Sequence, residues 1–250
     1  MSESLNSRPE QERLLRKLES IVDLSAEDRQ GLLALPITVK SLDADRDIVR
    51  ERDRPTECAL VLEGFVCRYK LIADGKRQIT GFYLPGDIPD LQSLFVEVMD
   101  HSLGTLTATR IALIPHDSIR SLLRHHPKLA ETFWRDTLID AAMFREWMIG
   151  LGRRDAYARI AHLFCELFVR HRAVRLTDGD GFDLHATQAE LGDALGLSTV
   201  HVNRVLQDLR KDGLIALRGK RLTILEWDEL KRAGEFDPLY LHLKSADLAE

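Results

Sequence analysis

The side chains best suited to chemistry lie together in residues 187–210, where the donors and acceptors match the edges of base pairs. Arg204 can donate to both acceptors on a guanine edge, and Asn203 can pair with adenine. The methyl groups of Thr199 and Val200 can contact the methyl group of thymine. These residue types at helical spacing predict a helix that reads duplex DNA in the major groove.

Two short helices must position these side chains. Thr187 with Glu190 forms a capping box that begins the first helix. Gly196 allows a tight turn, because a positive φ costs glycine little. Ser198 caps the second helix, whose buried stripe we expect to be Val202, Val205, Leu206 and Leu209. Two helices about a glycine turn, the second with a polar face, predict a helix-turn-helix.

A basic hairpin follows this pair of helices. Residues 213–225 read as strand, turn at Gly219-Lys220, and strand, which predicts a wing. Residues 199–221 contain six arginines and lysines and two aspartates, a local charge of +4 on a chain whose net charge is −5. A local concentration of positive charge is what phosphate binding needs. The predicted DNA-contacting residues are Thr187, Ser198, Thr199, Val200, His201, Asn203, Arg204, Arg218, Lys220 and Arg221, of which the last three would hold phosphates.

Residues 127–151 predict one long helix, because Pro127 suits a first turn and no other glycine or proline occurs before Gly150. Apolar or small residues recur at alternating spacings of four and three, the seam of a two-helix coiled coil. A helix packed only on its own domain is the alternative. We expect the seam to be a dimer interface, with Gly150 and Gly152 as a hinge to the next unit. The seam residues are Trp134, Thr137, Ala141, Phe144, Met148 and Leu151.

Residues 37–115 are rich in β-branched and aromatic residues and are broken by turn signals at Gly64, Asp74-Gly75 and 85–87. Short strands at this spacing predict an antiparallel barrel or sandwich. The fold class expected is therefore α+β: a β-rich N-terminal domain, a long helix and a C-terminal winged helix-turn-helix. One more helix and an irregular end should follow Trp227.

With these motifs, nearly the whole chain resembles the Crp/Fnr family of bacterial transcription regulators. Residues 195–206 carry the most specific part, and residues 212–215 and 82–87 also match. The resemblance implies a cyclic-nucleotide-binding-like β-roll at 1–126, a dimerisation helix at 127–151 and a winged helix-turn-helix with a tail at 152–250. It also implies a homodimer on a pseudo-palindromic duplex site and contact with RNA polymerase, so that we expect activation.

The chain departs from the family pattern at several functional positions. Many members have a glutamate where this chain has Val200, so the half-site should be relaxed or altered at that base. Members that bind cyclic AMP have a glutamate at the position of Leu91 and an arginine at that of His101, beside Ser102. A histidine replaces a bidentate, always-charged phosphate partner poorly. The candidate effector pocket comprises Asp87, Asp90, Leu91, His101 and Ser102, with cyclic AMP disfavoured as its ligand.

Other classes of protein fit less well. Three scattered cysteines cannot hold a four-thiolate iron–sulfur cluster, whereas haem is not excluded. No nucleophile elbow, phosphate-binding loop, metal-ligand spacing or dinucleotide fingerprint occurs, so we expect no enzyme and identify no metal site or cofactor. The polar N-terminus and the lack of a long apolar run predict a cytoplasmic protein with no membrane partner. A small-molecule-sensing module whose winged helix contacts a protein is the alternative function.

Overall fold

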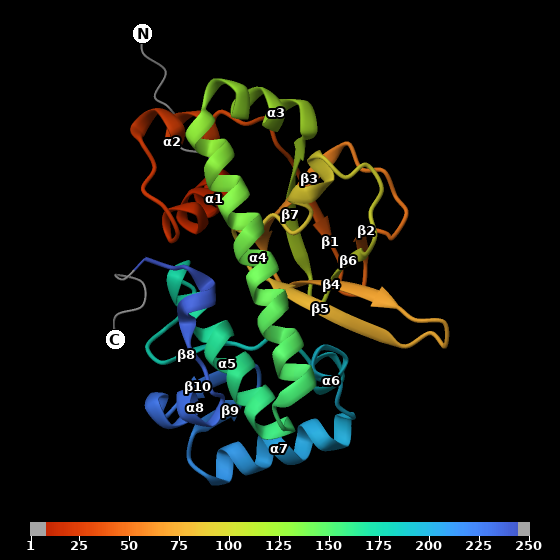
Figure 1. Ribbon diagram of the computed structural model, residues 1–250, viewed down its shortest axis with the longest axis vertical. Helices are drawn as coiled ribbons and strands as arrows, with labels where there is room; N and C mark the ends of the chain where they lie inside the picture. Colours follow the sequence, from red (N-terminus) through yellow and green to blue (C-terminus); the bar gives the residue numbers. More distant parts are fainter. Residues whose placement is uncertain (1–8, 245–250) are drawn as a thin grey trace. The chain divides into compact units, whose positions relative to one another are not determined.

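A computed structural model describes residues 9–244 (Figure 1). The chain divides into two compact units. Among the described residues the first unit comprises 9–66 and 83–137, and the second comprises 67–82 and 138–244. Each unit is therefore built from two separate stretches of sequence.

Antiparallel strands and helices make up the first unit. Its sheet has the strand order β1-β7-β3, and β2 pairs separately with β6. The strands are β1 (Thr38–Leu42), β2 (Asp47–Val49), β3 (Glu57–Glu63), β6 (Ser102–Thr105) and β7 (Thr109–Pro115). The helices are α1 (Pro9–Glu19), α2 (Ala26–Leu33), η1 (Leu91–Leu94), α3 (His116–His125) and the beginning of α4 (Pro127–Arg153). The short antiparallel strands predicted for residues 37–115 are confirmed.

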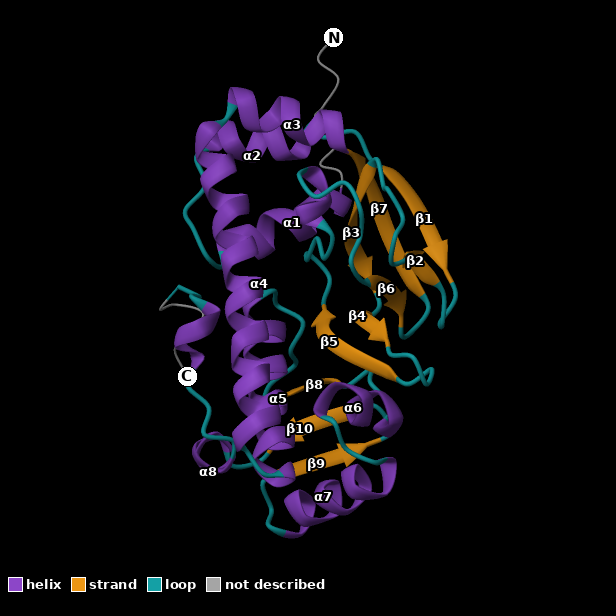
Figure 2. Cartoon of the chain, turned by 45° about the vertical axis from the view of Figure 1, so that its right-hand side comes forward, coloured by secondary structure: helices purple, strands orange, loops and turns teal. Residues whose placement is uncertain are grey.

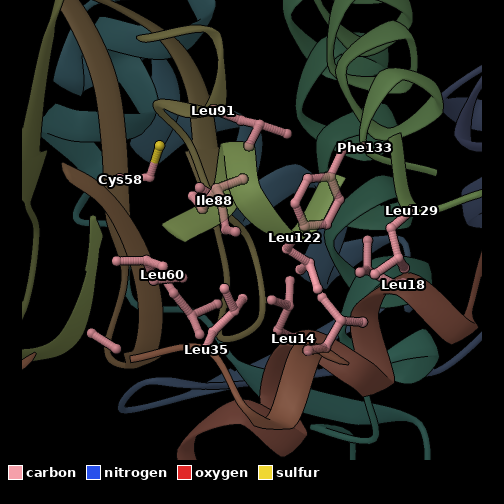
Figure 3. Packing of buried hydrophobic residues seen from close by; sticks show 14 of the residues in the cluster. Leu14, Leu18, Leu35, Cys58, Leu60, Ile88, Leu91, Leu122, Leu129 and Phe133 are labelled. Atoms are coloured by element: carbon pink, nitrogen blue, oxygen red, sulfur yellow. The ribbon is translucent and has the colours of Figure 1, made fainter. Parts of the chain in front are cut away.

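The core of the first unit lies between strand β3 and helices α1, α3 and α4 (Figure 3). Leu60 of β3 belongs to the same cluster as Leu14 and Leu18 of α1, and Leu122 and Phe133 contribute to it from α3 and α4. All five side chains are buried. Removing such apolar area from water stabilises the fold by about 25 cal/mol per Å².

Helix α4 runs without interruption from Pro127 to Arg153. It continues through Gly150 and Gly152, and the backbone N–H of Arg154 still donates to the carbonyl oxygen of Gly150 at 3.2 Å. The hinge expected at these glycines is therefore not a break in the helix. The break comes at Asp155, which caps the next helix by accepting a 2.8 Å hydrogen bond from the N–H of Ala158.

The second unit contains a hairpin and a helical domain with a small sheet (Figure 2). The hairpin strands are β4 (Val66–Leu71) and β5 (Arg77–Tyr83). The domain contains α5 (Ala156–Ala173), β8 (Gly181–Asp183), α6 (Gln188–Leu195), α7 (Thr199–Lys211), β9 (Ile215–Arg218), β10 (Arg221–Ile224), α8 (Trp227–Ala233) and the 3-10 helix η2 (Pro238–Leu241). The sheet order is β8-β10-β9, all antiparallel. Helix α5 is buried along most of its length and forms the scaffold of this unit.

Candidate nucleic-acid interface

Helices α6 and α7 begin and end where the local sequence predicts. Thr187 and Glu190 form the complete capping box of α6, and Gly196 ends that helix in the left-handed region at φ 65°. The backbone N–H of His201 donates to Ser198 Oγ at 3.2 Å, which caps α7. A Cβ at Gly192 would lie 2.5 Å from the carbonyl oxygen of Leu197, so the close turn between the helices requires glycine there.

One face of α7 is buried and the other is open to solvent. Val202, Val205, Leu206 and Leu209 are buried, as the sequence predicts. Thr199, Val200 and Arg204 are exposed, and the side chain of Val200 is 81% exposed. An apolar side chain so exposed at the start of a helix is suited to contact with a thymine methyl group. His201 is half-buried on the same turn.

Asn203 is held by two glutamines that the sequence analysis did not single out. Its Nδ2 donates to Gln188 Oε1 at 3.1 Å, and its Oδ1 accepts from Gln207 Nε2 at 3.0 Å. Gln207 lies one turn further along α7, a spacing that could have predicted the contact. Gln188 lies on α6, and only the packing of the two helices brings it near. In this arrangement both ends of the Asn203 amide are used, so adenine pairing would require Asn203 to exchange these partners.

The three basic residues of the predicted wing differ in their surroundings. Arg218 and Lys220 are exposed at the turn between β9 and β10. Arg221 Nη2 instead donates to the carbonyl oxygen of Asp178 at 2.5 Å, and Nη1 lies 3.9 Å from Asp183 Oδ1. Arg221 thus connects the wing to the turn before β8, whereas the other two side chains extend into solvent.

The carboxylates of the candidate effector pocket are engaged within the first unit. Asp87 Oδ1 lies 3.2 Å from Lys17 Nζ, and Asp87 Oδ2 accepts from the N–H of Leu84 at 2.8 Å. Asp90 Oδ1 accepts from the N–H of Ala59 at 2.9 Å. Burial raises the pKa of Asp90 to about 7. Both carboxylates therefore stabilise the strand ends and loop around them.

The remaining three candidates occupy different surroundings. Leu91 is buried and helps to line a groove of about 260 Å³. His101 Nδ1 lies 2.8 Å from Asp100 Oδ1, and its Nε2 lies 3.2 Å from Gln92 Nε2 in the wall of that groove. Ser102 Oγ accepts from the N–H of Glu51 at 2.9 Å. Of the five candidates, the lining of this groove includes Leu91 alone. The groove is lined by Leu91, Gln92, Leu94, Phe95, Val96, Leu123, Ala130, Phe133, Trp134 and Thr137.

These residues do not fit a cyclic nucleotide bound in the family's usual way. Leu91 offers no acceptor to a ribose hydroxyl, and the neighbouring Asp90 carboxyl is buried and already bonded to the backbone. His101 is buried beside Asp100 and replaces a phosphate-binding arginine. The effector pocket formed by these five residues stays a prediction, with cyclic AMP disfavoured as its ligand.

The cysteines are buried in both units. Cys58, Cys67 and Cys165 form no disulfide bond and have no solvent exposure. Burial raises the pKa of the Cys58 and Cys165 thiols, which keeps both as unreactive thiols. Within residues 9–244, no cluster of three or more His, Cys, Asp or Glu side chains could hold a metal ion.

The predicted seam of α4 is largely open to solvent in the single chain. The exposed fractions are 66% for Trp134, 42% for Phe144, 58% for Met148 and 42% for Leu151. Thr137 and Ala141 are half-buried. The opposite face of the helix is buried through Leu129, Phe133, Ile139 and Ala142. A row of large exposed apolar side chains on one helix is typical of a surface that another protein covers.

Comparison with known proteins agrees with this architecture. A family model described as a cyclic nucleotide-binding domain matches residues 39–126, and one described as a Crp-like helix-turn-helix domain matches residues 158–233. The transcriptional activator protein FnrL of Cereibacter sphaeroides is 30% identical over 192 residues, covering 74% of this chain and 75% of that protein. The chain belongs to the Crp/Fnr family.

Two further relatives of this Crp/Fnr protein extend the comparison. The transcriptional activator protein anr of Pseudomonas aeruginosa is 29% identical over 79% of this chain and 86% of its own length. The structure of FixK2 from Bradyrhizobium japonicum superimposes with a TM-score of 0.72 at 26% identity, covering 80% of this chain and 98% of that one. The predicted fold class is thus confirmed, and the protein is a DNA-binding transcription regulator, as predicted, rather than an enzyme.

The comparisons do not test the roles predicted for individual site residues. Members of the family bind effectors or cofactors. Among the described helices, none is long and apolar enough to span a membrane.

Proposed function

We propose that the protein is a homodimeric transcription activator in which α7 of each copy reads one half of a pseudo-palindromic duplex site. The observation that carries the proposal is the open face of α7, where Thr199, Val200 and Arg204 are exposed at the start of a helix that a buried stripe holds in place. Arg204 would donate to a guanine edge, and Val200 and Thr199 would contact thymine methyl groups.

Phosphate contacts would orient this helix in the groove. Arg218 and Lys220 extend from the wing, and the local charge of residues 199–221 is +4. The exposed α4 seam would join the two copies, so that the two recognition helices lie about one helical turn of DNA apart. Because the relatives named above are transcriptional activators, we expect RNA polymerase to be the partner of this protein at the promoter. We place this activity in the cytoplasm, where a bacterial chromosome lies.

Selection of bound sequences from a random duplex pool tests the proposal. The parent protein should recover a pseudo-palindrome, and Arg204→Ala should lose the preference at one base pair of each half-site, a discrimination worth about 1–3 kcal/mol. Arg210→Ala is the matched control, because Arg210 is an exposed arginine in the last turn of the same helix. It should weaken binding to all sequences to a similar degree.

The outcomes separate the proposal from its main alternative. A palindrome that Arg204→Ala leaves unchanged would remove α7 as the reading helix. Weak binding that is sensitive to salt and blind to sequence would favour a winged helix that contacts a protein instead of DNA.

A further inference from the structure

Residues 234–241 follow the part of the chain that matches the Crp-like helix-turn-helix domain, which ends at residue 233. This segment, which we call the tail, returns to the scaffold helix α5. Gly234 approaches α5 so closely that a Cβ there would lie 2.5 Å from the backbone nitrogen of His162. Phe236 is buried against the His162 ring, at a centroid distance of 5.2 Å. The tail is therefore packed as an integral part of the second unit.

A buried carboxylate joins the tail to two helices. Glu166 of α5 has no solvent exposure. Its Oε2 accepts from Tyr240 Oη at 2.9 Å and from Trp147 Nε1 at 3.0 Å, and its Oε1 lies 3.2 Å from Arg170 Nη1. Trp147 belongs to α4, Arg170 to α5 and Tyr240 to the tail. One carboxylate thus accepts a hydrogen bond from each of three elements.

The same network reaches the end of the β4–β5 hairpin. Arg170 Nη2 donates to the carbonyl oxygen of Phe82 at 2.7 Å, and the Phe82 ring meets Trp147 edge to face at a centroid distance of 5.6 Å. His162 Nδ1 donates to the carbonyl oxygen of Gly234 at 2.9 Å. Burial and the adjacent Glu166 carboxylate raise the pKa of Tyr240, so its hydroxyl remains a donor at every physiological pH.

A buried charged network is an expensive way to add stability, because each charge must leave water. Its directional hydrogen bonds instead favour one arrangement of the groups that it joins. Here those groups are the C-terminal part of α4, which carries the dimer seam, and α5, which carries the winged helix. Rotation of α5 against α4 would break the contact of Glu166 with Trp147, and the Tyr240 hydroxyl holds the Glu166 carboxylate in place for that contact.

We propose that the tail is a latch, which holds α5 on the C-terminal part of α4 through Tyr240 and Glu166 and thereby sets the separation of the two recognition helices in the dimer. Tyr240 and Glu166 are positioning residues that make no contact with DNA. The inference rests on the proposed function for its effect on DNA binding, and the latch itself can also be measured without DNA.

The DNA test compares binding to three duplexes. One carries the selected palindrome, one carries the same half-sites moved apart by one base pair, and one carries a single half-site. Tyr240→Phe should reduce the spacing preference by about tenfold, the factor expected for one lost hydrogen bond to a charged group. Its affinity for the single half-site should stay within about twofold of the parent, because α6, α7 and the wing are unchanged. Leu239→Ala is the matched control, since Leu239 precedes Tyr240 in η2 and is 73% exposed.

Hydrogen exchange of the DNA-free protein provides the second measurement. Tyr240→Phe should accelerate exchange in the last turns of α4 and in α5 by about tenfold and leave α7 unchanged. An unchanged spacing preference in Tyr240→Phe would overturn the latch. Equal losses of affinity on all three duplexes, together with a lower melting temperature of the protein, would also overturn it. Failure of the parent to bind any duplex would defeat the proposed function, and the exchange measurement would then decide the latch alone.

Discussion

Arg221 Nη2 donates a 2.5 Å hydrogen bond to the carbonyl oxygen of Asp178, which ties the wing strand β10 to the turn before β8. The sequence alone placed Arg221 with Arg218 and Lys220 as a phosphate contact. The structure separates them, because Arg221 contacts the protein whereas the other two are exposed. The three residues should therefore behave differently when they are replaced.

Lys220→Ala should lower the slope of log affinity against log salt concentration by about 1, because one phosphate contact and its released counterion are lost. Arg221→Ala should leave that slope close to the parent value and lower the free energy of unfolding by about 1 kcal/mol through the lost hydrogen bond. Titrations at several salt concentrations and denaturant unfolding measure both quantities. A reduced salt slope in Arg221→Ala would show that its side chain leaves Asp178 to bind phosphate.

Val200→Glu should change the preferred base pair of the half-site. A glutamate can accept from the amino group of cytosine, which valine cannot do. Because Val200 is 81% exposed, the glutamate needs no space in the core, and the free energy of unfolding should change little. Competition binding on half-sites that differ at one pair should show a gain of about 1–3 kcal/mol for the cytosine-containing pair. A uniform loss on every half-site would mean that residue 200 faces the backbone rather than the bases.

Met148→Lys should weaken the dimer. Met148 lies on the predicted α4 seam and is 58% exposed in the single chain, and a lysine opposite its symmetry mate would place two like charges in an apolar interface. The matched control is Ile149→Lys, because Ile149 is 50% exposed on the same turn but outside the heptad pattern. Sedimentation equilibrium should show more monomer for Met148→Lys than for Ile149→Lys. Equal effects would place the interface elsewhere on the helix.

Asp90→Asn should alter how stability depends on pH. Burial raises the pKa of Asp90 to about 7 in the folded protein, against about 3.9 in an unfolded chain. Between these values the folded state keeps a proton that the unfolded state releases, so the contribution of Asp90 to stability is present at low pH and is lost as the pH rises towards 7.

The free energy of unfolding of the parent, minus that of Asp90→Asn, should therefore fall between pH 5 and pH 7, by at most about 1.4 kcal/mol per pH unit. Chemical denaturation of both proteins at each pH measures this difference, in which the contributions of the other titrating groups cancel. A difference that stays constant between pH 5 and pH 7 would mean that Asp90 ionises in the folded protein as it does in water.

The sequence by itself determined the local elements and the class of function. The capping box at Thr187, the left-handed turn at Gly196 and the cap at Ser198 depend on neighbouring residues alone, and the structure has each of them as predicted. The buried stripe of α7 also follows from a helical period that is readable without a fold. The boundaries 126/127 and 151/152, the individual base contacts and the effector pocket stay predictions.

Only the tertiary structure decided which polar groups find partners far away in the sequence. It paired Asn203 with Gln188, Arg221 with Asp178, Asp90 with the backbone of Ala59, and Glu166 with both Trp147 and Tyr240. These contacts depend on how complete elements pack, and the residue type of a polar side chain does not reveal which buried partner will satisfy it. For that reason the helix proposed to read DNA could be predicted from the sequence, whereas the contacts of these buried polar groups could be found only in the folded chain.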